Sequence, residues 1–258
     1  MKAERLLGYP VSRSSACELA RLVGAWIEHG ETRHWFACLN PHSLEVAERD
    51  GNFKSALNDA DFLVPDGVGM LIASKHLGGA IRERVTGYDV FAAVHDQLAA
   101  TGGSRVFFLG SSPGVLEKIA ERFALDYPTL TLAGVYSPPY KPAFSAEDNE
   151  AMSEAVNAAR PDVLWIGMTA PKQEKWIAEH IDQLDVVFAG AIGAVFDFYA
   201  GTVKRSSPVF QRLGLEWLPR LLQEPHRLWY RNFVSNPRFV LRVLVARLRG
   251  ERAQLIDD

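Results

Sequence analysis

Short apolar runs alternate along the chain with longer segments of helical periodicity. Six runs of aliphatic, β-branched or aromatic residues predict β-strands, at 35–39, 62–64, 106–109, 131–135, 163–167 and 186–189. Among the helical segments, the clearest begins at Ser112-Pro113, where Ser is a favoured N-cap and Pro a favoured first helical residue. Strands interleaved with helices predict an α/β fold, with a Rossmann-like, mostly parallel sheet and helices on both faces.

The pattern changes after Gly201. Residues 208–233 and 237–249 have helical character and interleave arginines with aromatic and aliphatic residues. We therefore expect two parts, an α/β domain at residues 1–203 and a basic amphipathic helical appendage at residues 204–258. Two arrangements suit the last helix equally: it lies in a membrane interface, or it packs on the body with its arginines facing water.

The composition, 48% hydrophobic and 23% charged, is typical of a globular protein. Two cysteines, Cys17 and Cys38, are too few for a disulfide framework or a zinc site and indicate reduced thiols. No stretch approaches the ~18 apolar residues of a spanning helix, and the N-terminus lacks the apolar core of a signal peptide. We therefore expect a cytoplasmic protein.

Charge is distributed unevenly along the chain. The net charge is −3, but Lys204 to Arg252 contains eleven basic and three acidic residues, a net +8, against −11 for the remainder. A basic tail on an acidic body indicates an anionic partner, such as phosphates, lipid headgroups or nucleic acid. Sparse lysine and the apolar spacing favour an anionic membrane surface over nucleic acid.

Three acids flank the predicted strand at 62–64. Ligands of open parallel sheets bind beyond the carboxyl ends of the strands. Asp59 and Asp61 precede this strand, so their D-x-D pattern is interpreted as turn acids and not as a metal site. Asp66 follows the strand and is a candidate general base. The alternative for Asp66 is an N-cap of the helix through Met70.

Five turns at strand ends carry candidate ligand-binding residues and are expected to converge on one crevice. They lie at 38–41, 65–67, 110–112, 167–174 and 190–193, and include Gly110, Ser111, Lys172 and Gln173. The Gly110-Ser111 turn offers backbone N–H groups and a helix N-terminus to an anion, although plain helix capping explains it equally well. It matches neither a Walker A loop nor a dinucleotide fingerprint. Together the turns favour a nucleotide or diphosphate ligand.

Seven segments, in order and over most of the chain, resemble the WecG/TagA/CpsF family of bacterial glycosyltransferases. They are LNPHSLEVA, ADFLVPDGVGM, RERVTGYD, FFLGSSPGVLE, PDVLWIGMTAPKQEKWI, GAVFDFYAGTVKRS and LGLEWLPRLLQEPHRLWYR. The resemblance implies an inverting enzyme that moves a hexose from a UDP-sugar to an undecaprenyl-diphosphate-linked saccharide, without a cofactor or bound metal. N-acetylmannosamine, its uronic acid and glucose are the donor sugars it implies, and surface polysaccharides the products.

The resemblance also implies roles for individual residues. Asp66 would be the general base on the acceptor hydroxyl, Asn40 would hold a sugar, and Gln173, with Lys172 beside it in P-K-Q-E, would contact the nucleotide-sugar. Asp197 and Tyr140 would lie near the uridine. Arg84, Thr86 and Asp89 belong to another family motif. The arginines assigned to the diphosphates are Arg220, Arg227 and Arg231. Two positions depart from the family pattern: Cys38 stands where Thr is common, and Tyr230 where a basic residue is common.

Two other function classes remain open at this point. A Rossmann-like oxidoreductase or methyltransferase would bind NAD or S-adenosylmethionine, although the glycine fingerprint is absent. A non-catalytic adaptor would use only the basic tail to bind membranes. The partners we expect are a UDP-sugar and a polyprenyl-diphosphate-linked acceptor. The protein would be peripheral on the inner face of the plasma membrane. The resemblance adds a possible homo-oligomer.

Overall fold

A nine-stranded sheet, mostly parallel, forms the centre of the molecule. The computed structural model describes residues 2–203 and 229–256. Within them the strand order is β6-β5-β7-β8-β3-β4-β2-β1-β9. The strands are β1 Ala3–Leu6, β2 Tyr9–Ser12, β3 His34–Leu39, β4 Phe62–Pro65, β5 Arg105–Gly110, β6 Thr131–Tyr136, β7 Val163–Gly167, β8 Phe188–Ala191 and β9 Gln254–Ile256. Neighbours from β6 to β2 are parallel, and β1 runs antiparallel to both β2 and β9.

The six predicted strands are all present, which confirms the α/β class and the mostly parallel sheet. The sixth begins at Phe188 and not at Val186. The carbonyls of Val186 and Val187 still accept hydrogen bonds from the N–H groups of Arg33 and His34, at the start of β3. Sequence reasoning missed β1, β2 and β9. These are short strands at one side of the sheet, and three to four residues are too few to show an alternating pattern.

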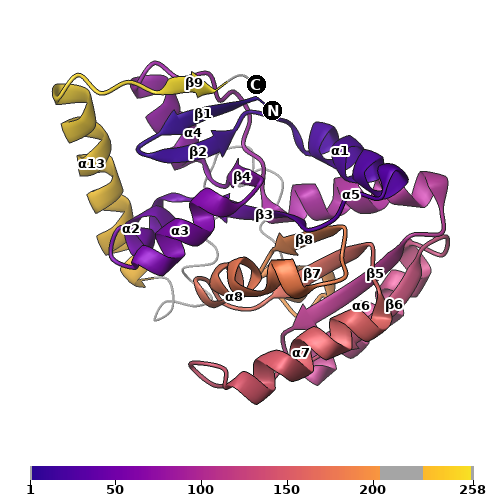
Figure 1. Ribbon diagram of the computed structural model, residues 1–258. Coiled ribbons are helices and arrows are strands. Elements are labelled where there is room, and N and C mark those ends of the chain that lie inside the picture. Colours follow the sequence, from indigo (N-terminus) through magenta and orange to yellow (C-terminus); the bar gives the residue numbers. More distant parts are fainter. Residues whose placement is uncertain (1, 204–228, 257–258) are drawn as a thin grey trace.

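Helices cover both faces of the sheet, as predicted (Figure 1). On one face lie α2 Pro41–Ala47, α3 Gly51–Asp59, α4 Val68–His76, α7 Ala146–Ala159, α8 Lys172–His180 and α13 Asn236–Leu248. The other face is covered by α1 Ala16–His29, α5 Gly87–Thr101, α6 Pro113–Asp126 and α9 Val195–Tyr199. A 3₁₀ turn, η1, spans Ile181–Gln183, and a π-helical turn, η2, spans Arg231–Ser235. Each face buries its own apolar cluster.

The described part of the C-terminal appendage packs against the body. Figure 1 shows α13 along one side of the molecule, with β9 returning to the sheet beside β1. The helix buries Phe239, Val243 and Ala246 in the same cluster as α2 and α4. Arg242 binds Glu45 at 2.9 Å and Glu48 at 3.1 Å, so this arginine faces α2 and not water. Packing on the body is therefore confirmed for this helix, while the boundary at 203/204 stays a prediction.

Several apolar side chains of α13 remain exposed. They are Val240, Leu241, Leu244 and Leu248, with exposed fractions from 49% to 87%. Among the described residues, no helix combines the length and the apolar character that crossing a membrane requires.

Candidate active site

The five predicted turns follow five adjacent parallel strands. In the sheet these are β5, β7, β8, β3 and β4, and all five end at the same edge. Sequence reasoning predicted this shared edge correctly from chain direction alone. The structure adds which turns line the main pocket: the ends of β3 and β4 do, through Pro41, Asp66 and Gly67.

Asp66 directly follows β4 and lies at the mouth of this pocket. Its backbone N–H donates to the carbonyl of Leu39 at 2.8 Å, which ties the ends of β3 and β4 together. The next residue, Gly67, is the N-cap of α4, with φ at +107°, a conformation that favours glycine. The helix therefore begins two residues after Asp66, at Val68, and the N-cap alternative for Asp66 is wrong.

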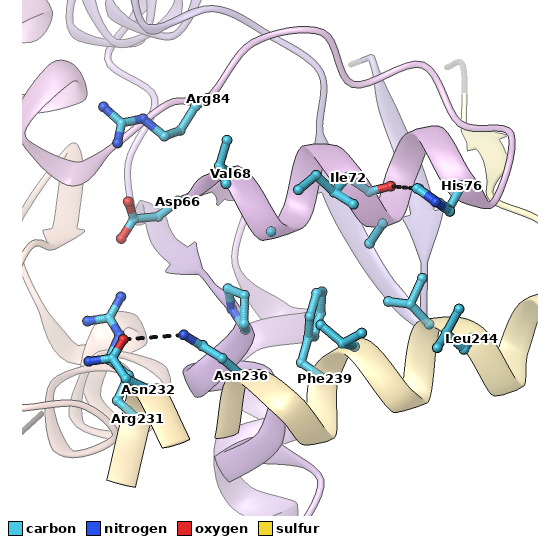
Figure 2. A pocket seen from close by; sticks show the side chains of 16 residues that line it. Asp66, Val68, Ile72, His76, Arg84, Arg231, Asn232, Asn236, Phe239 and Leu244 are labelled. Atoms are coloured by element: carbon cyan, nitrogen blue, oxygen red, sulfur yellow. Dashed lines mark hydrogen bonds between the residues drawn. The ribbon is translucent and has the colours of Figure 1, made fainter. Parts of the chain in front are cut away.

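Two arginines from distant parts of the chain reach the same pocket as Asp66. Figure 2 shows the Asp66 carboxylate facing the space between the guanidinium groups of Arg84 and Arg231. Val85 N–H donates to the carbonyl of Pro65 at 3.2 Å and so holds the Arg84 segment against the end of β4. Arg231 arrives on η2, which the hydrogen bond between His42 Nδ1 and Ser235 Oγ, 2.9 Å long, holds against α2. A carboxylate beside two cations can accept a proton while diphosphate charge is balanced nearby.

The acids at the other end of β4 lie in different settings. Asp61 accepts the backbone N–H of Trp35 at 2.9 Å and binds His34 Nδ1 at 3.1 Å, which joins the starts of β3 and β4. Asp59 is the exposed last residue of α3. Both positions agree with the interpretation as helix-end and turn acids. Among the described residues, no cluster of three or more His, Cys, Asp or Glu is arranged to hold a metal ion.

Asn40 and Cys38 lie at the end of β3, next to the Asp66 turn. The Asn40 amide oxygen caps α2 by accepting the N–H groups of His42 and Ser43, both at 3.0 Å. Its Cβ lies beside Gly67, and its predicted contact with a sugar stays a prediction. Burial raises the pKa of the Cys38 thiol well above its ordinary value, and the carboxylates of Asp66, Glu174 and Asp89 raise it further. Cys38 is therefore a neutral thiol.

Gln173 and Glu174, at the start of α8, are both buried. Gln173 accepts the N–H of Met168 at 3.2 Å and donates to Glu174 Oε1 at 2.9 Å, with 5% of its surface exposed. Its predicted contact with the nucleotide-sugar stays a prediction, since only its second amide hydrogen is left for a ligand. Within the described part of the chain, Glu174 Oε2 has no hydrogen-bond partner. Burial raises the pKa of Glu174 to about 7, a feature that sequence reasoning missed.

The Gly110-Ser111 turn lies between β5 and α6 and is hydrogen-bonded to the end of β7. Gly110 has φ at +121°, and a Cβ there would lie 2.6 Å from the carbonyl oxygen of Gly167. Ser111 N–H donates to that same carbonyl at 3.0 Å. Ser112 is the N-cap of α6 and Pro113 its first residue, as predicted, although the Ser112 side chain makes no capping bond. An anion at this turn would therefore meet the first N–H groups of α6 and not that of Ser111.

Tyr140 lies on the loop before α7, and Lys172 is the first residue of α8. Tyr140 is fully exposed. Lys172 Nζ donates to the carbonyl of Lys141 at 2.9 Å and lies 4.3 Å from the centre of the Phe144 ring. Burial lowers the pKa of Lys172. Lys172 thus holds the 137–145 loop against α8, and its role toward the donor stays a prediction.

The other predicted site residues are dispersed. Thr86 is the N-cap of α5 and forms a capping box with Asp89. Asp197 lies on α9, half-buried, and its carbonyl accepts the N–H groups of Thr202 and Val203. Arg220 and Arg227 lie outside the described residues, so only Arg231 of the three predicted tail arginines can be placed. The pocket lining that sequence reasoning missed comprises Val68, Gly69, Ile72, Ala73, His76, Asn232, Asn236, Phe239, Val240, Val243 and Leu244.

Comparison with known proteins adds an independent finding. A family model described as "Glycosyl transferase WecG/TagA/CpsF family" matches residues 4–253. Curated proteins of Bacillus spizizenii, Bacillus subtilis and Staphylococcus aureus are 31%, 29% and 24% identical. The alignments cover 85%, 80% and 96% of this chain and 85%, 77% and 95% of the three relatives. Each relative is named N-acetylglucosaminyldiphosphoundecaprenol N-acetyl-beta-D-mannosaminyltransferase.

Proposed function

The chain belongs to the WecG/TagA/CpsF family of glycosyltransferases, and from that premise we propose that it transfers N-acetylmannosamine from a UDP-sugar to an N-acetylglucosamine carried by undecaprenyl diphosphate. The relatives' names supply the sugar and the acceptor, and the resemblance supplies UDP as the leaving group. Family membership favours this function over the oxidoreductase, methyltransferase and adaptor alternatives.

The observation that carries the proposal is the position of Asp66. It stands at the carboxyl edge of the sheet, in a pocket that also contains Arg84 and Arg231. In the proposed reaction its carboxylate takes the proton of the acceptor hydroxyl as the oxygen attacks the anomeric carbon of the donor. The bond from that carbon to the UDP oxygen breaks, UDP leaves with the electron pair, and the configuration inverts.

We assign the stabilisation of the leaving diphosphate to arginines and helix N-termini, without a divalent metal. Charge-assisted hydrogen bonds from guanidinium groups suit phosphate oxygens, and Arg84 and Arg231 line the pocket. Turnover that persists in excess EDTA would support this assignment. Loss of turnover in EDTA, with recovery on addition of Mg²⁺ or Mn²⁺, would contradict it.

The direct test is a panel of UDP-sugars with a short-chain polyprenyl-diphosphate N-acetylglucosamine. We expect UDP release and a lipid product whose mass increases by one N-acetylhexosamine, with UDP-N-acetylmannosamine as the best donor. Another donor as the best substrate would revise the sugar. UDP release from no donor, by a folded protein, would overturn the proposal.

We also propose that the enzyme works on the inner face of the membrane. The exposed apolar side of α13 and its arginines, including Arg238 and Arg249, suit an interface of anionic headgroups and acyl chains. Sedimentation with anionic vesicles, and weaker sedimentation with neutral vesicles, is the expected result. If the protein sediments with neither the anionic nor the neutral vesicles, this location is contradicted.

A further inference from the structure

The pocket of Asp66 continues as an apolar groove between α4 and α13, here called the α4–α13 groove. Its walls are Val68 and Ile72 from α4, and Phe239, Val240, Val243 and Leu244 from α13. Figure 2 shows Ile72 and Phe239 between the polar end, at Asp66, and the far end, at His76 and Leu244. The whole pocket encloses about 360 Å³. Ligand pockets commonly enclose about 300–1,000 Å³, so this one suits the first segment of a long chain.

A glycine allows α4 to approach the start of α2 closely beside the groove. A Cβ at Gly69 would lie 2.6 Å from Cγ of Pro41, so a side chain there would force Pro41 or α4 to shift. The same Cβ would lie 3.6 Å from Cε1 of Phe239, an ordinary contact distance. The close packing of α4 on Pro41 therefore favours glycine at this turn.

The α13 wall is held in place along its length. Arg242 binds the acids of α2, and Arg247 Nη1 donates to the carbonyl of His76 at 2.8 Å. Beyond the helix, Ala253 N–H donates to the carbonyl of Leu77 at 3.0 Å, and β9 pairs with β1. These contacts fix α13 to both ends of the groove, which makes the groove a built feature of the fold.

The rim of the groove is apolar and open to solvent. Ile72, Val240 and Leu244 have exposed fractions of 51%, 55% and 49%. Burial of such side chains against an apolar ligand removes apolar surface from water and so stabilises the complex. Leu248, one turn beyond Leu244, is 87% exposed and extends the apolar stripe to the end of the helix. A long apolar ligand would therefore gain free energy along this whole line.

We propose that the α4–α13 groove binds the first isoprenoid units of the polyprenyl acceptor, whose saccharide lies at Asp66, an inference that rests on the proposed function. The chain leaves the groove over Leu244 and Leu248 toward the membrane. The pocket then matches the two ends of the acceptor, with the saccharide hydroxyl at Asp66 and the isoprenoid in the apolar segment.

The chemistry of the walls favours an isoprenoid over a peptide. Both walls are α-helices, whose backbone N–H and C=O groups are used within each helix. A peptide bound in extended form would bring its own backbone polar groups into an apolar groove without partners. An isoprenoid chain has no such groups, and the branched aliphatic side chains of the walls suit its methyl branches.

A series of acceptors tests the inference. All carry the same saccharide and diphosphate, but end in a methyl, geranyl, farnesyl or undecaprenyl group. For the wild type we expect KM to fall from methyl to farnesyl. In Ile72→Asp and Val240→Asp, the ratio of farnesyl to methyl KM should rise about tenfold or more over the wild-type ratio, because a charge in the groove opposes apolar contact. Both positions are half-exposed, so the variants should fold.

Leu125→Asp is the matched control, since Leu125 is an exposed leucine of α6, on the other face of the sheet. Its KM ratio should equal that of the wild type. A wild-type KM that does not depend on the chain, or a ratio unchanged in both groove variants, would overturn the inference.

Calorimetry with farnesyl diphosphate separates this inference from the proposed function. If no sugar is transferred but farnesyl diphosphate binds more tightly than inorganic diphosphate, and Val240→Asp removes the difference, the groove site stands and the proposed reaction fails. Equal binding of the two probes counts against the groove whatever the activity.

Discussion

The two ends of strand β4 carry chemically similar acids in opposite settings. At the amino end, both Asp61 oxygens bind neighbours, the backbone N–H of Trp35 and the ring of His34. At the carboxyl end, Asp66 lines a pocket with two arginines. Four residues separate the two acids, yet one joins strands and the other lines a pocket. The comparison shows that chain direction, and not the acidic residue itself, decides which aspartate reaches the pocket at the carboxyl edge.

The largest effect should come from Asp66→Asn. Asparagine keeps the shape of the side chain but cannot take the acceptor proton, so kcat should fall by about 10²–10⁴-fold. UDP release under saturating substrates measures it, and thermal unfolding should be unchanged. Turnover near that of the wild type would remove Asp66 from the role of base.

Glu174 adds a third acid to the comparison. It lies near the carboxyl edge of the sheet, as Asp66 does, but its side chain is buried. Its folded-state pKa of about 7 lies above the ordinary value of 4.5. Between pH 4.5 and pH 7 the folded protein binds more protons at this position than the unfolded chain does. The free energy of unfolding therefore falls as the pH rises through this range, and the loss is complete above pH 7. The shift corresponds to about 3 kcal/mol.

Denaturant unfolding at a series of pH values measures the Glu174 effect. In Glu174→Gln, the fall in unfolding free energy from about pH 4.5 to about pH 8 should be smaller than in the wild type by about 3 kcal/mol. Identical pH profiles for the two proteins would show that Glu174 ionises as it does in the unfolded chain.

Replacement of Arg231, one of the two arginines in the pocket of Asp66, should have an intermediate effect. Arg231→Gln removes a charge-assisted hydrogen bond to diphosphate, worth about 1.5–3 kcal/mol, so kcat/KM should fall about tenfold to a hundredfold. Arg238→Gln is the control, because Arg238 is an exposed arginine of the same region and does not line the pocket. Equal losses in the two variants would indicate a general effect of tail charge.

The smallest effect should come from the opposite end of β4. Asp61→Ala leaves the buried N–H of Trp35 without its partner, so the free energy of unfolding should fall by about 1–2 kcal/mol. Once the protein is folded, kcat should equal that of the wild type. A loss of kcat comparable to that of Asp66→Asn would erase the difference between the two ends.

The sequence was sufficient for the features that depend on neighbouring residues. Apolar runs of three to five residues located six of the parallel strands, but not β2, and Ser112-Pro113 located the start of α6. Once the strands were parallel, chain direction placed Asp66 and Asp61 at opposite edges. Turn and capping chemistry is equally local, although it offered Asp66 as an N-cap of α4, where the structure has Gly67.

Only the tertiary structure decided which distant segments meet. It brought Arg231 and α13 to the pocket of Asp66, formed the groove against α4, buried Gln173 and Glu174, and added β9 to the sheet beside β1. The helical pattern of α13 predicted an apolar side but not its partner, because periodicity reports which face is apolar and not what it contacts. The physical reason is that such contacts depend on shape and charge matching between elements far apart in the chain, which local propensities do not encode.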